Sequence, residues 1–201
     1  MIYKVVCTCY TIIFKIFFRW DVRGKENIPS KGALIICSNH ISWWDPPLVG
    51  CLLWPRKVSY MAKEELFKIP LFRSFLLSIK AFPVKRDSAD RRAIKKSLEI
   101  LKNNEVLGLF PEGTRSKTDN FLPPQPGIAL IAIKSEAAVL PIAIVGPYRI
   151  FRPIRVQIGT PMNLSEYYDQ KISGGQFEQI AGKIMDEVFR LRQMAKDGEQ
   201  S

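Results

Sequence analysis

Two short apolar runs, each followed at once by a polar cluster, constrain this chain more than any other feature. Residues 33–37 and 106–110 are the two runs, and runs of this kind are typical of parallel strands that are buried on both faces. Similar runs alternate with amphipathic segments along the 201 residues, without a linker rich in glycine or proline. The alternation predicts one α/β domain with a mainly parallel or mixed sheet flanked by helices.

The spacing of apolar residues predicts the individual elements. We expect strands at residues 33–37, 58–61, 81–84, 106–110, 139–145 and 154–158. We expect helices at residues 63–67, 71–79, 88–103, 127–135 and 173–195, and a loop over 38–47. Pro83 cannot donate a backbone hydrogen bond, so its strand should lie at an edge of the sheet. Ser88 is the expected N-cap of its helix.

The first 20 residues are apolar apart from a regularly spaced polar set. These polar residues recur every three or four positions, so on a helix they form one stripe: Lys4, Thr8, Thr11, Lys15 and Arg19. The longest uncharged run is shorter than the ~18–20 residues that span a bilayer. We expect residues 1–20 to form an amphipathic helix in the membrane interface, and residues 21–201 to form the domain proper. A helix packed on the domain core, or a tilted helix that partly enters the bilayer, is the alternative.

The net charge of +11 favours an anionic partner. Residues 57–96 alone carry a net charge of +7, and apolar side chains are interleaved with the charges. That mixture favours an acidic membrane surface, although solvated helix faces would have the same composition. A nucleic acid is not an expected partner, because the chain has no zinc-finger or RNP-type motif. The four cysteines lack the spacing of a zinc site, and we expect them to be reduced.

The polar cluster at residues 38–46 contains the only histidine of the chain, His40. Asp45 follows five residues later. If the loop brings this carboxylate to the imidazole, it fixes the tautomer of His40, which can then act as a general base. A structural histidine in a loop is the alternative interpretation.

The second cluster, residues 110–116, reads FPEGTRS. Gly108 and Gly113 have the spacing of a phosphate-binding P-loop, but Thr114 occupies the position of the essential lysine and Glu112 would repel phosphate. Nucleotide hydrolysis is therefore not expected. The cluster still offers backbone donors, hydroxyls and a guanidinium to a phosphomonoester, from Gly113, Thr114, Arg115 and Ser116. Because both clusters follow strands, we expect the site at the carboxyl ends of the sheet.

Together the clusters resemble sequence blocks of the glycerolipid acyltransferases. Residues 39–45 match the first block, N-H-x-x-x-x-D, and residues 110–116 match the third, F-P-E-G-T-R-S. Residues 82–86 resemble the second block through Arg86, and residues 139–143 resemble the fourth. The resemblance implies acyl transfer from a thioester of acyl carrier protein or coenzyme A to the sn-2 hydroxyl of lysophosphatidate, which gives phosphatidate.

The resemblance also implies roles for individual residues. His40, held by Asp45, would be the general base, and Glu112 would organise the site through hydrogen bonds. The substrate-binding set would be Arg86, Glu112, Gly113, Thr114, Arg115 and Ser116. No metal, other cofactor or covalent acyl-enzyme is expected, and the enzyme would work on the cytoplasmic face of a bacterial membrane. Glycerol 3-phosphate or a lyso-aminolipid as acceptor, and a membrane-surface binding protein without catalysis, are the alternatives.

Overall fold

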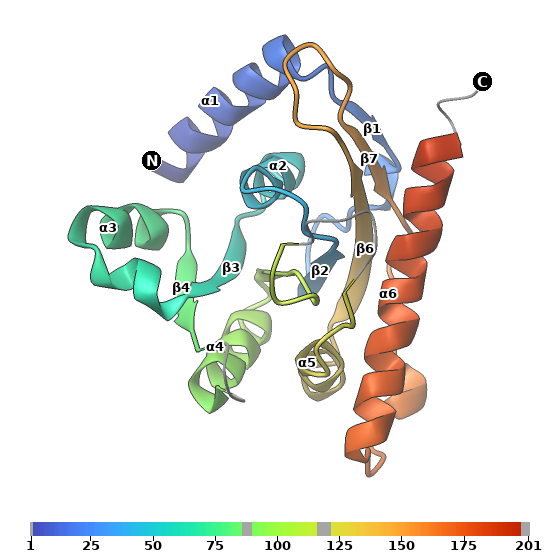
Figure 1. Ribbon diagram of the computed structural model, residues 1–201. Coiled ribbons are helices and arrows are strands. Elements are labelled where there is room, and N and C mark those ends of the chain that lie inside the picture. The colour runs from blue at the N-terminus through green and yellow to red at the C-terminus, as the bar shows by residue number, and fades with distance from the viewer. Residues whose placement is uncertain (1, 86–89, 116–121, 198–201) are drawn as a thin grey trace.

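The computed structural model describes residues 2–85, 90–115 and 122–197, and these form three layers (Figure 1). The strands are β1 (Asp21–Arg23), β2 (Leu34–Ser38), β3 (Val58–Lys63), β4 (Ala81–Val84), β5 (Val106–Leu109), β6 (Ala138–Val145) and β7 (Arg155–Ile158). The α-helices are α1 (Ile2–Phe17), α2 (Asp45–Leu52), α3 (Pro70–Ser78), α4 (Arg91–Lys102), α5 (Gly127–Ser135) and α6 (Gly174–Asp197). Three short 3-10 helices complete the described elements: η1 (Lys25–Asn27), η2 (Glu64–Lys68) and η3 (Ser165–Tyr167).

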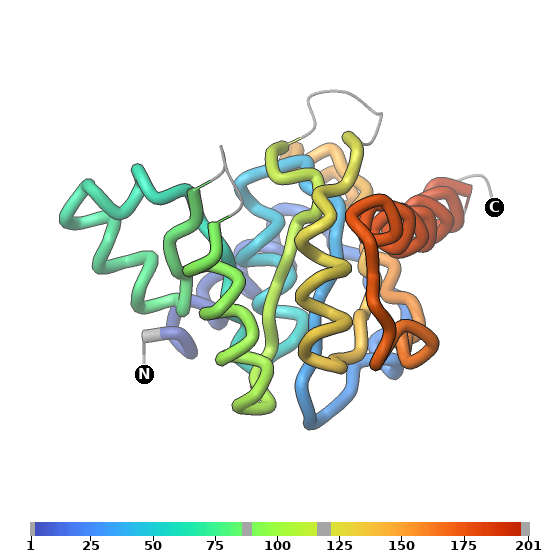
Figure 2. Tube along the Cα trace, turned by 90° about the horizontal axis from the view of Figure 1, so that it is seen from below, coloured from blue at the N-terminus to red at the C-terminus, as the bar shows by residue number. Residues whose placement is uncertain are grey.

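The seven strands form one mixed sheet in the order β1-β7-β6-β2-β5-β3-β4. Strands β6, β2, β5, β3 and β4 are parallel to one another, and β7 runs antiparallel to β6. β1 pairs with β7 in parallel. Helices α1 and α2 cover one face, and Figure 2 shows α4, α5 and α6 side by side across the other. The predicted α/β domain with a mixed sheet is confirmed.

The position of β2 in the middle of the sheet explains why its residues 34–37 are all apolar. Leu34 and Ile36 pack toward α1 and α2 on one face of the sheet, whereas Ile35 and Cys37 pack toward α4, α5 and α6 on the other. Successive side chains of a strand point to opposite faces, so a strand covered on both sides is apolar along the part that both layers cover. The apolar runs thus mark the middle of the three layers.

Most predicted elements are present, and the differences have simple causes. β4 is an edge strand that pairs only with β3, as Pro83 predicts. The loop expected over residues 38–47 is wrong at its end, because α2 already begins at Asp45. Proline is tolerated in the first helical turn, where its missing N–H has no partner to lose. The three-residue strand β1 was not predicted.

The predicted N-cap of α4 is also wrong. Asp90 is the N-cap, and its side chain accepts hydrogen bonds from the backbone N–H groups of Arg92 and Ala93 at 2.9 and 3.3 Å. The expected cap, Ser88, lies outside the described residues. Aspartate caps a helix as well as serine does, so the preference for Ser88 had no basis in cap chemistry alone.

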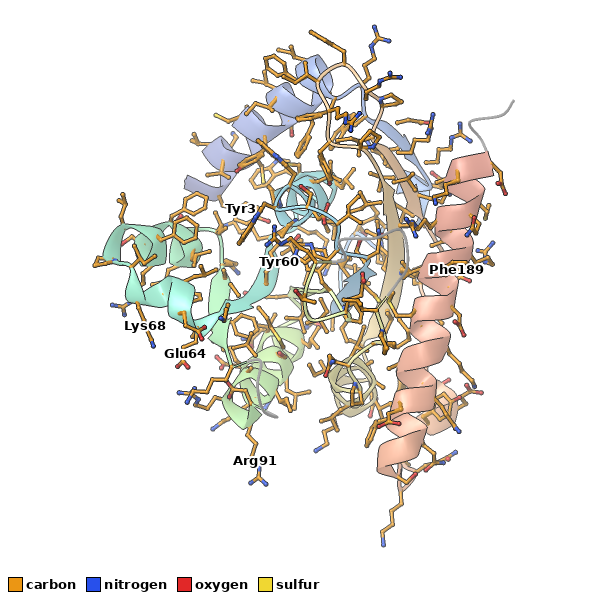
Figure 3. All side chains as sticks on the ribbon, in the orientation of Figure 1. Tyr3, Tyr60, Glu64, Lys68, Arg91 and Phe189 are labelled. Atoms are coloured by element: carbon orange, nitrogen blue, oxygen red, sulfur yellow. The ribbon has the colours of Figure 1, made fainter. Side chains whose placement is uncertain are left out.

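The N-terminal helix α1 is present, and it has one apolar face that is buried and a second that is exposed. Tyr3, Cys7 and Phe14 are buried against the domain, and the hydroxyl of Tyr3 accepts the backbone N–H of Val58 at 3.0 Å (Figure 3). A second apolar face stays open, with Val5, Ile12 and Ile16 each more than half exposed. Within the described residues, none of the helices has the length and apolar character needed to cross a membrane.

Candidate active site

The two polar clusters meet because β2 and β5 are parallel neighbours. Cys37 pairs with Leu109 in register, so both strands end at the same edge of the sheet. Beyond that edge, Oε1 of Glu112 accepts a hydrogen bond from the backbone N–H of His40 at 3.0 Å. This contact joins the first cluster to the second.

His40 and Asp45 form the predicted contact: Nδ1 of the imidazole lies 2.8 Å from Oδ2 of the carboxylate. The same oxygen accepts the backbone N–H groups of Ile41 and Ser42, each at 2.7 Å. The loop therefore wraps around one carboxylate. Asp45 is also the first residue of α2, where the helix dipole stabilises a negative charge.

Tyr148 completes the surroundings of Asp45. Its hydroxyl donates to Oδ1 of Asp45 at 2.5 Å. Burial, with the nearby Asp45 charge, raises the pKa of Tyr148 well above its ordinary value, so the phenol remains protonated and able to donate. Asp45 is fully buried, and both of its oxygens are hydrogen-bonded. A buried carboxylate is tolerated when its lone pairs are satisfied in this way.

The tautomer of His40 follows from this arrangement. The ionised carboxylate has only lone pairs, so Nδ1 must carry the proton in their hydrogen bond. The lone pair of neutral His40 is then on Nε2, on the side of the ring away from Asp45. An imidazole with this tautomer can accept a proton from a hydroxyl group.

Two aromatic rings form a stacked column with the imidazole of His40. The imidazole stacks on Phe110 with ring centroids 4.3 Å apart, and Phe110 in turn stacks on Tyr60 at 6.1 Å. Gly108 makes room for this column, since a Cβ there would lie 2.3 Å from Cε1 of Tyr60. Gly108 is thus explained by packing, and its P-loop spacing to Gly113 has no structural counterpart.

Asn39 joins the end of β2 to β6. Its side-chain amide donates to the carbonyl of Ile144 at 2.9 Å and accepts the N–H of the same residue at 2.8 Å. The residue is buried, so this pair of bonds satisfies an amide that would otherwise be costly to bury. Asn39 therefore fixes the backbone from which His40 projects.

The second cluster turns back on itself after Glu112. Gly113 has a positive φ of 68° and its N–H donates to the carbonyl of Phe110 at 3.0 Å. This left-handed conformation favours glycine. Thr114 and Arg115 then reach the surface, and the Arg115 guanidinium lies 4.1 Å from the ring centroid of Trp43. Trp43 belongs to the first cluster and is 64% exposed, so the two clusters also meet at the rim.

Comparison with known proteins places the chain in a family. The sequence model described as Acyltransferase matches residues 19–145. The chain belongs to the acyltransferase family. It is 32% identical over 170 residues to the 1-acyl-sn-glycerol-3-phosphate acyltransferase of Bacillus subtilis, an alignment that covers 82% of this chain and 84% of that relative. It is 27% identical over 190 residues to the enzyme of the same name from Streptococcus pneumoniae, covering 88% and 70%.

A solved structure has the same fold as this acyltransferase. It is the 1-acyl-sn-glycerophosphate (LPA) acyltransferase PlsC from Thermotoga maritima. The TM-score is 0.73 at 26% sequence identity, and the match covers 99% of this chain and 80% of that one. The resemblance stated from the sequence blocks is therefore confirmed at the level of the family.

The structure of this acyltransferase brings together part of the predicted site. The imidazole of His40 contacts Asp45 and its backbone N–H contacts Glu112, and Gly113, Thr114 and Arg115 follow at the rim. The remaining two predicted residues, Arg86 and Ser116, lie outside the described residues. Among the residues that are described, no group of three or more His, Cys, Asp or Glu side chains is placed to hold a metal ion.

Sequence reasoning missed Tyr148 and gave no role to Asn39 or Phe110. Asn39 and Phe110 lie inside the recognised blocks, so their positions were known. Tyr148 lies outside all of them. The available signal was its place three residues beyond Val145, the end of β6, because β6 is parallel to β2 and ends at the same edge of the sheet.

Proposed function

We propose that this acyltransferase uses His40 as a general base to acylate the sn-2 hydroxyl of 1-acyl-sn-glycerol 3-phosphate, giving phosphatidate. The observation that carries the proposal is the 2.8 Å contact between Nδ1 of His40 and a fully buried Asp45. This contact holds the imidazole in the tautomer whose Nε2 can accept a proton. The names of the Bacillus, Streptococcus and Thermotoga relatives support the choice of acceptor.

The proposed reaction needs no covalent intermediate on the protein. Nε2 of His40 takes the proton of the hydroxyl as its oxygen attacks the carbonyl carbon of an acyl thioester. The carbon–sulfur bond then breaks, and the imidazolium returns the proton to the leaving thiolate of acyl carrier protein or coenzyme A. The products are one ester and one thiol. Cys37 is not a competing nucleophile, since burial raises the pKa of its thiol far above the ordinary value.

The acceptor phosphate would bind beside this base. Arg115 is exposed next to Trp43, and its planar fork can donate two hydrogen bonds to a phosphate. Gly113 and Thr114 lie at the same rim and would add a backbone donor and a hydroxyl. Arg86 and Ser116 complete the proposed phosphate-binding set on the basis of their sequence blocks. Glu112 points inward to two backbone N–H groups and so stays away from the phosphate.

We also propose that the enzyme works on an acidic membrane surface, at the cytoplasmic face of the cell membrane. The open apolar face of α1 (Val5, Ile12 and Ile16) is flanked by exposed lysines. Helix α3 is a second exposed apolar element: Leu71 is 85% exposed and only Leu76 is buried. In both Figure 1 and Figure 2, α3 and the N-terminal end of α1 lie on the side of the molecule away from α6. Apolar side chains among lysines and arginines suit an anionic interface.

A release assay for free thiol would test the reaction. Purified protein is supplied with acyl carrier protein or coenzyme A thioesters, crossed with lysophosphatidate, glycerol 3-phosphate and a lyso-aminolipid. We expect thiol release and phosphatidate formation with lysophosphatidate, and a loss of roughly 10²–10⁴-fold in turnover for His40→Ala. A folded His40→Ala variant with near-full activity would contradict the mechanism. Preference for another acceptor would replace the proposed substrate while leaving the chemistry intact.

A further inference from the structure

A groove of about 720 Å³ lies beside the N-terminal helix and does not include the base among its lining residues. One wall is α1, another is the end of α2 with the segment that leads to β3, and the third is the segment between β1 and β2. Asp45 is at the first residue of the eight-residue α2, and the groove is at its other end. At ~1.5 Å per residue, that helix alone separates the two sites by roughly 10 Å.

The lining of the groove combines three cations with apolar side chains. Lys15, Lys25 and Arg56 supply the charge, and neither aspartate nor glutamate is among the lining residues. The apolar part comes mainly from Trp20, Trp54, Ile12, Ile28, Leu52 and Leu53. Grooves of about 300–1,000 Å³ with apolar walls and a few polar groups are the usual form of small-molecule sites.

The three cations have no acidic partner within the described part of the chain. Arg56 donates to the backbone carbonyls of Pro29, at 2.8 Å, and Gly32. Burial lowers the pKa of Arg56, which is half-buried. Lys25 lies 5.7 Å from the ring centroid of Trp20, and no described carboxylate forms an ion pair with Lys15. An anion in the groove would therefore meet uncompensated positive charge.

The polar stripe of α1 contributes to this groove. Thr8, Thr11 and Lys15 of the stripe are lining residues, whereas Lys4 of the same stripe is not. Ile12 lines the groove and also belongs to the open apolar face of α1. The groove is thus continuous with the face that the proposed function places against the bilayer.

We propose that this groove binds an anionic phospholipid of the membrane. The phosphate would lie among Lys15, Lys25 and Arg56, and the first part of an acyl chain would lie along the apolar wall. The occupant is a lipid because free phosphate would leave the tryptophan and isoleucine walls unused, while a neutral lipid would leave the cations unpaired. The proposal rests on the membrane location proposed above, and is independent of the role of His40.

A binding titration with a soluble short-chain lipid would test the site. The full-length protein is titrated with dihexanoyl phosphatidylglycerol below its micelle concentration, and tryptophan fluorescence reports occupancy because Trp20 and Trp54 line the groove. Dihexanoyl phosphatidylcholine and inorganic phosphate are the comparison ligands. We expect saturable binding of phosphatidylglycerol, and binding at least tenfold weaker for the other two.

Lys15→Glu and Lys4→Glu form a matched pair of variants, because both reverse one exposed charge on the same stripe of α1. We expect Lys15→Glu to weaken phosphatidylglycerol binding by tenfold or more and Lys4→Glu to change it less than twofold. Thr11→Trp fills the groove without changing the charge, and should also abolish binding. Far-ultraviolet circular dichroism and a urea titration check that each variant folds.

Three results would overturn the proposal. Equal weakening by Lys4→Glu and Lys15→Glu would show that only net charge matters. Equal affinity for phosphatidylcholine would exclude a headgroup site, and phosphate binding as tightly as lipid would exclude a role for the apolar wall. Thiol release with lysophosphatidate in detergent micelles tests the proposed reaction separately from the lipid site. Lys15→Glu should retain this thiol release. If the unaltered protein releases no thiol, the proposed reaction is contradicted, but the lipid site is not.

Discussion

Glu112 bonds to the backbone of His40, not to its imidazole. Oε1 accepts the His40 N–H at 3.0 Å, and Oε2 accepts the N–H of Leu122 at 3.2 Å, across a loop that leaves the end of β5. One buried carboxylate thus ties the loop after β2 to both ends of the loop after β5. The imidazole contacts Asp45 instead, so Glu112 holds the backbone of His40 and Asp45 orients its ring.

Glu112→Gln should therefore lower both stability and activity. Glutamine has one acceptor oxygen and one NH₂ group, so one of the two backbone N–H groups would face a donor. Leaving a buried donor unsatisfied costs about 1–3 kcal/mol, and we expect a decrease of this size in the free energy of unfolding. Urea denaturation measures the stability and thiol release measures kcat. A variant as stable as the parent would contradict the proposed tie.

Tyr148→Phe should impair the reaction while preserving the fold. It removes the donor to Oδ1 of Asp45 and leaves the packing of the ring unchanged. A hydrogen bond to a charged group contributes about 1.5–3 kcal/mol, so we expect kcat to fall roughly tenfold to hundredfold. The Michaelis constant for the phosphorylated acceptor should change little, because Tyr148 is on the Asp45 side of the site. An unchanged kcat would show that the bond has no part in positioning His40.

Arg115→Ala should act on acceptor binding. Removing a guanidinium that holds a phosphate should raise the Michaelis constant for lysophosphatidate roughly tenfold to hundredfold. Stability should be almost unchanged, since an exposed contact between a cation and an aromatic ring contributes only about 0.5–1 kcal/mol. A monoacylglycerol, which lacks the phosphate, serves as the control acceptor. An equal effect on both acceptors would exclude the phosphate role.

The protein should lose stability as the pH rises above about 8.5, where an unfolded thiol ionises. Burial raises the pKa of Cys51 to about 12, so the folded chain keeps this proton while the unfolded chain releases it. Ionisation then favours the unfolded state, and the free energy of unfolding falls between these two pH values. Urea titrations at several pH values should show a smaller fall for Cys51→Ala. An identical slope would show that the proton of the Cys51 thiol is not retained in the folded chain at high pH.

The sequence predicted the meeting of the two clusters because parallel strands end at a common edge. The pairing of His40 with Asp45 followed from a five-residue spacing on one loop. Both predictions rest on residues that are close in the sequence, either a strand with the cluster that follows it or a single loop, so the sequence of a short segment is enough to make them. The same holds for β4, where Pro83 alone indicated an edge strand.

Tyr148 could not be identified in this way. It is 103 residues from Asp45, in a segment without a recognised block, and only the order of the strands brings it close. The predicted end of the first loop was wrong for a different reason. Pro46 and Pro47 are equally compatible with a loop and with the first turn of a helix. The groove beside α1 depends on how that helix packs, which its own periodicity does not specify.

The stack of His40, Phe110 and Tyr60 links position 108 of β5 to position 60 of β3, which are paired in register. Any side chain at position 108 would occupy the space of the Tyr60 ring, so a larger residue at this position of β5 requires a smaller one at position 60 of β3. A relative that retained every polar residue of both clusters but carried a side chain at position 108 would have to displace the ring at position 60 on which Phe110 stacks. The residues at positions 108 and 60 therefore indicate whether a distant relative keeps the same catalytic geometry better than the polar residues of the two clusters do alone.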